Sequence, residues 1–184
     1  MLKSEILVAS PRKYGNTFTL SNHFNNLLDS SNTKSHLFDL YKYEIKPCMD
    51  CRGCKTGLMK CIQKDEFEVI AEKLENAEVI VFASPIYWFA PTAKMKLLID
   101  RLRPYYSNKK LSGKMAAIIL CSGSGEVDCD LTVEMYRRIF NTLEMKFLGA
   151  VISKAYDLGE AANDIKAIND IKKLSEKILF LSHN

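Results

Sequence analysis

The stretch Ile6-Leu7-Val8-Ala9-Ser10-Pro11-Arg12-Lys13-Tyr14-Gly15-Asn16-Thr17 decides the fold. It begins with four apolar residues, which are typical of a buried strand, and passes through a polar turn into a segment with helical spacing. The turn offers short hydroxyl and amide groups, a glycine that lets the backbone come close, and the unpaired N–H groups of a helix start. This strand, loop and helix together indicate an α/β protein with a phosphate site after its first strand.

Apolar runs and helical spacings alternate along the rest of the chain. The predicted strands are 6–9, 36–40, 79–83, 115–121 and 147–152, and the predicted helices are 17–28, 67–74, 92–102, 131–144 and 164–181. This alternation predicts crossover connections and a parallel sheet that is covered by helices on both faces. Eight strands cannot be found, so an open, doubly wound sheet in one domain over residues 1–184 is expected rather than a barrel.

Composition narrows the class of protein. The 184 residues are 47% hydrophobic and 26% charged, which is ordinary for a globular protein. No run approaches the roughly 18 apolar residues of a membrane helix, and the N-terminus lacks a secretory signal, so a cytoplasmic location is expected. The formal charge of +4 is dispersed along the chain. Neither nucleic acid nor a membrane is therefore an expected partner.

The loop after the first predicted strand supplies the candidate phosphate ligands. They are Ser10, Arg12, Gly15, Asn16 and Thr17. The loop lacks both Gly-x-x-x-x-Gly-Lys-Ser/Thr and Gly-x-Gly-x-x-Gly, which favours a monophosphate over a nucleoside triphosphate or a dinucleotide. The alternative is an ordinary polar turn in which Asn16 or Thr17 caps the helix and Arg12 lies in solvent.

Two more strand ends carry unusual loops. The third predicted strand runs into Ser84-Pro85-Ile86-Tyr87-Trp88-Phe89-Ala90-Pro91, where three aromatic residues can border a flat ligand and backbone N–H groups can reach its polar edge. These aromatics can equally fill the top of the core or a subunit contact. The fourth runs into Cys121-Ser122-Gly123-Ser124-Gly125, whose small residues allow a close approach to a ligand. A phosphate site, an aromatic border and a small-residue wall match the terminal phosphate and flat ring of FMN.

The motifs at 10–17 and 84–88, with Lys94-Met95-Lys96-Leu97-Leu98-Ile99-Asp100-Arg101, resemble the NADPH-dependent FMN reductase family of flavodoxin-like proteins. The resemblance implies a three-layer flavodoxin-like sandwich with a five-stranded parallel sheet in the order 2-1-3-4-5. It implies that the phosphate of FMN binds at Ser10, Arg12, Asn16 and Thr17. The isoalloxazine ring would lie along Pro85, Ile86, Tyr87, Trp88 and Phe89, with Ser122 and Gly123 on its other side.

Further properties follow only from this resemblance. NAD(P)H would be the electron donor, and the chemistry would be centred on the flavin, so no catalytic side chain is expected. A homodimer or a dimer of dimers, with FMN close to the interface, is expected as the assembly. Ala9 departs from the glycine that the family often has before the serine of the first loop.

Four cysteines lie in the irregular region between residues 41 and 64. Cys48, Cys51, Cys54 and Cys61 have a spacing closer to that of ferredoxins than to paired zinc knuckles, and thiolates are soft ligands. The pattern resembles the iron–sulfur flavoprotein branch of the family, which implies a [4Fe–4S] cluster that exchanges electrons with FMN. The alternative is an ordered cap over the flavin without a cluster. Cys121 and Cys129 are expected to be structural.

The sequence therefore predicts an FMN-dependent oxidoreductase, in which NAD(P)H reduces a flavin, a quinone or another small acceptor. A second hypothesis is an electron carrier with FMN and an iron–sulfur cluster, reduced by ferredoxin and without turnover of a small substrate. A third is a zinc-stabilised binding module that has no flavin.

Overall fold

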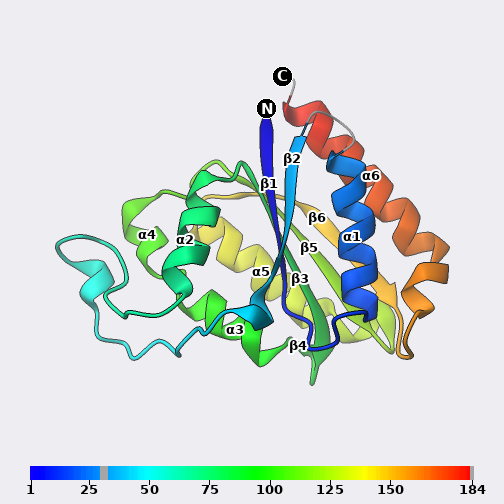
Figure 1. Cartoon of the computed structure of the whole chain (residues 1–184), viewed down its shortest axis with the longest axis horizontal. Coiled ribbons are helices and arrows are strands. Elements are labelled where there is room, and N and C mark those ends of the chain that lie inside the picture. Colours follow the sequence, from blue (N-terminus) through cyan, green and yellow to red (C-terminus); the bar gives the residue numbers. More distant parts are fainter. Residues whose placement is uncertain (30–32, 183–184) are drawn as a thin grey trace.

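A twisted parallel sheet lies between two layers of helices in the computed structural model, which describes residues 1–29 and 33–182 (Figure 1). The five parallel strands follow the order β2-β1-β3-β5-β6, and a short strand, β4, pairs antiparallel with the end of β3. The strands are β1 (Leu2–Val8), β2 (Thr33–Asp39), β3 (Val79–Tyr87), β4 (Ala90–Pro91), β5 (Met115–Ser122) and β6 (Lys146–Lys154). The predicted flavodoxin-like fold, with its five parallel strands in the order 2-1-3-4-5, is confirmed.

The helices divide between the two faces of the sheet. Helices α1 (Asn16–Asp29) and α6 (Ile165–Ser182) cover one face, and α2 (Phe67–Asn76), α3 (Ala93–Asp100), α4 (Pro104–Asn108) and α5 (Asp130–Thr142) lie on the other side (Figure 1). Short 3-10 turns complete the described chain: η1 (Leu40–Lys42), η2 (Gly53–Lys55), η3 (Gly125–Asp128) and η4 (Glu160–Asn163). Among the helices of the described ranges, none is long and apolar enough to cross a membrane.

Two hydrophobic cores explain why the strands are apolar throughout. Leu7, Phe82 and Ile118 pack on the side of α2 and α5, whereas Ile6 and Val81 pack on the side of α1 and α6. A parallel strand covered on both faces buries successive residues in opposite directions, so it needs a continuous apolar run. All eight residues of β5 are buried.

The structure extends or shortens several predicted elements. The first strand begins at Leu2 rather than at residue 6, because Lys3, Ser4 and Glu5 interrupt the apolar pattern although they pair with β2. The third predicted helix, 92–102, ends as α3 at Asp100, and α4 follows it as a separate helix with Pro104 in its first turn. Neither α4 nor β4 was predicted from the sequence.

Candidate cofactor site

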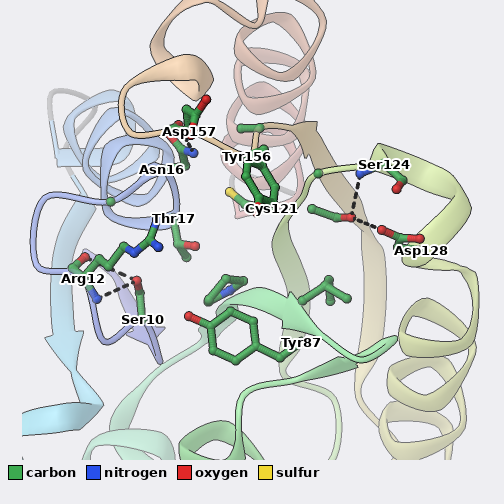
Figure 2. Close-up of a pocket in the computed structure, with 16 residues that line it drawn as sticks. Ser10, Arg12, Asn16, Thr17, Tyr87, Cys121, Ser124, Asp128, Tyr156 and Asp157 are labelled. Carbon is green, nitrogen blue, oxygen red and sulfur yellow. Dashed lines mark hydrogen bonds between the residues drawn. The ribbon is translucent and has the colours of Figure 1, made fainter.

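A cavity of about 730 Å³ opens at the carboxyl ends of β1, β3, β5 and β6 (Figure 2). Parallel strands end at one edge of the sheet, which is where open α/β sheets bind ligands, and this volume is in the range of roughly 300–1,000 Å³ that cofactor pockets have. Ten of the twelve predicted cofactor-binding residues line it: Ser10, Arg12, Gly15, Asn16, Thr17, Pro85, Ile86, Tyr87, Ser122 and Gly123. Six further lining residues were not predicted as ligands: Cys121, Ser124, Asp128, Ala155, Tyr156 and Asp157.

The turn between β1 and α1 is tight and is held by its own hydrogen bonds. The N–H of Gly15 donates to the carbonyl of Arg12 at 2.9 Å, and the N–H of Arg12 donates to Oγ of Ser10 at 3.3 Å. A Cβ on Gly15 would lie 3.0 Å from both Cβ and the carbonyl oxygen of Arg12, so a larger residue would force the turn open. The first turn of α1 then offers unpaired N–H groups and a partial positive charge, as an anion site requires.

The two ends of the cavity differ in charge. Arg12 is the only cation among the described residues that line it, and its guanidinium extends beside Thr17 (Figure 2). Asp128 lies across the cavity, where its Oδ2 accepts a 2.7 Å hydrogen bond from the hydroxyl of Ser122 (Figure 2). This hydrogen bond lowers the pKa of Asp128, so the carboxylate is ionised at neutral pH. Asp157 also lines the cavity and lies beside Asn16, so an anionic group is favoured next to Arg12 and away from both carboxylates.

Asn16 lines the cavity as predicted, and its side chain also holds the loop that follows β6. Its Nδ2 donates to the carbonyl of Asp157 at 2.8 Å, and its Oδ1 accepts from the N–H groups of Gly159 at 3.1 Å and Ala161 at 3.2 Å. The side-chain amide therefore fastens the loop after β6 to the start of α1. Asn16 can therefore offer a phosphate its backbone N–H and the second N–H of Nδ2, whereas Oδ1 already accepts two hydrogen bonds.

The β3–β4 hairpin brings only part of its aromatic run to the cavity. Tyr87 lines the cavity, whereas Trp88 and Phe89 form the two-residue turn of the hairpin and lie outside the lining. Both turn residues have positive φ, 52° and 62°, which is the backbone of a tight hairpin turn and is uncommon for bulky side chains. Trp88 is 92% exposed, and the carbonyl of Phe89 accepts a 2.9 Å hydrogen bond from Thr132. The predicted role of these two residues beside the ring does not follow from this arrangement.

Cys121 lines the cavity at the end of β5 (Figure 2). Burial raises the pKa of its thiol to about 12. The thiol is therefore protonated at neutral pH and is no nucleophile. Cys129 is also buried, and burial raises its pKa to about 12. Both thiols are buried, and the structural role expected for them stays a prediction.

The four remaining cysteines lie in a segment that projects at one edge of the molecule, beyond α2 and α4 (Figure 1). None of them is among the residues that line the cavity. Cys51 is exposed and the other three are half-buried, and none of the four is in a disulfide. Within residues 1–29 and 33–182, no three His, Cys, Asp or Glu side chains are grouped so that they could hold a metal ion. The thiols suit an iron–sulfur cluster in chemistry, but their placement in this conformation does not form the site.

A buried ion pair closes the base of this cysteine segment. Arg101 Nη1 lies 2.6 Å from Oδ2 of Asp65, Nη2 lies 3.0 Å from Oδ1, and both side chains are 1% exposed. Nη1 also donates to the carbonyl of Lys46 at 2.8 Å, and the guanidinium stacks on the ring of Phe67 at 4.7 Å. Burial alone would lower the pKa of Arg101, but Asp65 and the neighbouring Cys61 raise it above its ordinary value. The ends of the segment are thus fixed even though its thiols are not gathered.

Comparisons with known proteins agree with this geometry. The family model described as NADPH-dependent FMN reductase matches residues 2–157. An iron–sulfur flavoprotein of Archaeoglobus fulgidus is 33% identical over 130 residues, 68% of this chain and 57% of that longer protein. YwqN of Bacillus subtilis, provisionally named an NAD(P)H-dependent FMN-containing oxidoreductase, is 28% identical over 96% of this chain and 98% of its own.

Solved structures share the fold. The NAD(P)H:quinone oxidoreductase of Methanothermobacter marburgensis superposes with a TM-score of 0.69 at 16% identity, over 96% of this chain and 98% of that one. A flavodoxin from the domain Archaea superposes over the whole of both chains with a TM-score of 0.63 at 15% identity. At these identities the likeness concerns the fold alone.

Proposed function

This chain belongs to the NADPH-dependent FMN reductase family of oxidoreductases, and from that premise we propose that it binds FMN in the cavity at the strand ends and passes electrons from NAD(P)H to a small acceptor. One observation carries the proposal above the others. The same cavity joins the N-terminus of α1 and the guanidinium of Arg12 to the aromatic ring of Tyr87. A ligand with an anionic tail and a flat head has a matching place for each part.

The residues present fit FMN. Gly15, Asn16 and Thr17 bring the start of α1 to the cavity wall, and the first N–H groups of a helix are suited to hold a phosphate. Ser10 and Thr17 are buried beside the cavity and carry hydroxyl groups. Arg12 supplies the full positive charge that a phosphate dianion needs, because a charge-assisted hydrogen bond is roughly twice as strong as a neutral one.

FMN, when bound, accepts a hydride from a nicotinamide and gives up electrons singly or in pairs. The side chains of this protein then have the tasks of binding and orientation. The β3–β4 hairpin holds Tyr87 at the cavity, and its base is fixed by the N–H of Thr92, which donates to Oγ of Ser84 at 3.0 Å. Thr92 Oγ1 in turn donates to the carbonyl of Ala9 at 2.9 Å, so the hairpin is tied directly to the phosphate loop.

The titratable groups of the lining do not have to move a proton. Cys121 stays protonated because burial raises its pKa, and Asp128 stays ionised because Ser122 lowers its pKa. The proposed acceptor is a quinone, a flavin or another small molecule.

The proposal is tested with the purified chain. The apo protein should bind FMN one to one, with a flavin absorption spectrum and quenched fluorescence, and the complex should oxidise NADPH or NADH steadily when a quinone or free FMN is the acceptor. Arg12→Ala should weaken FMN binding, and Lys13→Ala is its matched control. Lys13 is an exposed cation of the same loop and does not line the cavity. Failure to bind FMN, or FMN binding with no reduction by either nicotinamide nucleotide, would contradict the reductase.

The cysteine segment supports a second candidate function. Four thiols within residues 48–61, together with relatives named iron–sulfur flavoproteins, favour an electron carrier that holds both FMN and a [4Fe–4S] cluster. The segment would have to rearrange around the cluster, since the thiols are not gathered here. Anaerobic purification followed by iron and acid-labile sulfide analysis separates the two candidates. About four irons per chain would favour the carrier, and none would leave the simple reductase.

A further inference from the structure

Tyr156 stands between two cavities. The loop after β6 carries it, and it lines both the 730 Å³ cavity and a second, adjoining cavity of about 450 Å³. Among the residues that the structure describes, Gly123 and Tyr156 alone line both spaces. The second cavity is otherwise polar, with Lys154, Glu160 and Asn163 among its lining residues. The ring of Tyr156 is thus a partition between a candidate cofactor site and an open polar space.

The ring lies against the backbone of Gly123. A Cβ built on Gly123 would come within 2.9 Å of Cδ2 of Tyr156, closer than side-chain atoms normally approach. Any residue larger than glycine at this position would therefore push the ring away. This contact gives a reason for glycine at position 123, whose backbone conformation does not itself require it.

The backbone that carries Tyr156 is firmly held, whereas its side chain is largely exposed. The carboxylate of Glu160 accepts from the N–H groups of Tyr156 at 2.6 Å and Asp157 at 3.0 Å. The side-chain amide of Asn16 adds its three hydrogen bonds to the same loop. The residue as a whole is 79% exposed. The loop is anchored so that the ring can turn about its side-chain bonds without moving the chain.

Tyr156 faces Tyr87 across the cavity. Figure 2 shows the two rings on opposite sides of the open space, one from the β6 loop and the other from the β3–β4 hairpin. A flat heterocycle between them would contact an aromatic ring on each side. Such contacts contribute beyond the burial of surface alone.

We propose that Tyr156 is a movable aromatic wall of the flavin site. Its ring packs on the bound flavin, and it swings into the second cavity when the nicotinamide ring of NAD(P)H takes its place. The hydroxyl group then finds polar partners there, which a phenylalanine could not use. This inference rests on the proposed function and identifies the residue that decides which reactants reach the flavin.

Loss of the Tyr156 ring should then change the affinities for FMN and for NAD(P)H in opposite directions. FMN loses a stacking partner in Tyr156→Ala, and aromatic stacking of this kind corresponds to about a two- to twelvefold change in affinity. NAD(P)H should bind more tightly to Tyr156→Ala, because in the wild type it must first displace the ring. Where only part of the protein is in the binding-competent state, the apparent affinity falls in proportion to that fraction. If Tyr156 had a purely structural role, its replacement would weaken the binding of both ligands.

The experiment compares the wild type with Tyr156→Ala, Tyr156→Phe and Gly123→Ala. FMN affinity is measured by fluorescence titration, and the apparent Kd for NADPH comes from the concentration dependence of anaerobic flavin reduction. Tyr156→Ala should raise the Kd for FMN and lower that for NADPH, each by about two- to twelvefold. Tyr156→Phe should keep wild-type FMN affinity, since it keeps the ring.

Gly123→Ala tests the same wall without touching the tyrosine. Its added methyl group should displace the ring and weaken FMN binding, but it should add nothing further in a protein that already carries Tyr156→Ala. Unchanged affinities in Tyr156→Ala, or parallel weakening of both ligands, would overturn the inference while leaving the reductase intact. A wild type that fails to bind FMN would overturn the proposed function itself.

Discussion

Replacing Asp65 with alanine should destabilise the protein strongly, because it leaves the guanidinium of Arg101 buried and unpaired. The carboxylate accepts two hydrogen bonds from Arg101 and two from the backbone, the N–H of Lys46 at 2.8 Å and that of Phe67 at 3.2 Å. Both partners of the ion pair are 1% exposed, so water cannot replace what is lost. Breaking a buried pair from one side costs about 3–5 kcal/mol, a large share of the roughly 5–15 kcal/mol that stabilises a domain.

Urea unfolding followed by circular dichroism measures the effect. With a slope of about 2 kcal/mol per molar urea, the midpoint should fall by about 1.5–2.5 M. Asp50→Ala is the matched control in the same segment, since Asp50 pairs with Arg103 at 2.5 Å but the two side chains are 56% and 38% exposed. Exposed ion pairs contribute about 0–1 kcal/mol, so Asp50→Ala should lower the urea midpoint less than Asp65→Ala, although the Asp50 contact is slightly shorter.

The loss should also depend on pH. Burial alone would raise the pKa of Asp65, but the hydrogen bonds from Arg101 and Lys46 outweigh it and hold this pKa below the ordinary 3.8. A carboxyl group with a lowered pKa stabilises the fold above its unfolded-state pKa, and this contribution disappears as the pH falls through the folded-state value. The stability gap between wild type and Asp65→Ala should therefore be full at pH 7 and shrink below about pH 4. A loss under 1 kcal/mol at pH 7, or a gap that persists in acid, would refute the reasoning.

Three further changes test the site. Arg12→Ala should weaken FMN binding by about 1.5–3 kcal/mol by fluorescence titration, if its guanidinium bonds the phosphate as proposed, and an affinity equal to that of Lys13→Ala would remove Arg12 from the site. Asn16→Ala should release the loop after β6, which limited proteolysis would detect as faster cleavage at 157–161; unchanged protection would show that the three hydrogen bonds do not hold it. Trp88→Gly should relieve the positive φ and stabilise the hairpin by up to about 1 kcal/mol in urea, with FMN affinity unchanged, whereas a large loss of affinity would place the indole at the flavin.

Much of the fold follows from sequence pattern because the sheet is covered on both faces. β5 is buried at every position, so it appears in the sequence as an uninterrupted apolar run from Met115 to Cys121. The start of β1 breaks this rule, since Ser4 is buried although polar and Lys3 bonds Glu78 through its backbone N–H. These positions belong to the sheet because their backbones pair with neighbouring strands, and such pairing cannot be seen in the hydrophobicity of the sequence.

The site was predictable where a motif coincides with a strand end. The loop at 10–17 and the residues Pro85 to Tyr87 were found in this way. Tyr156 and Asp157 were missed although they follow β6 at the same edge of the sheet, because no motif marks them. The strand-end rule applied to the fifth strand would have indicated that loop.

Some roles depend on distant partners that sequence does not reveal. Asn16 stands in a phosphate motif, yet its side chain bonds a loop more than 140 residues away in the chain. The Trp88–Phe89 pair stands in an aromatic motif, yet a hairpin turn directs it outside the cavity lining. In both cases the residue types indicated which segment lies near the cavity, but not which groups each side chain contacts.

A crystal structure of the chain soaked or grown with FMN would test the central claim most directly. The account predicts density for the phosphate against the N–H groups at the start of α1 and the guanidinium of Arg12, with the flavin ring beside Tyr87. Density for the flavin elsewhere, or a phosphate oriented toward Asp128 instead, would contradict it.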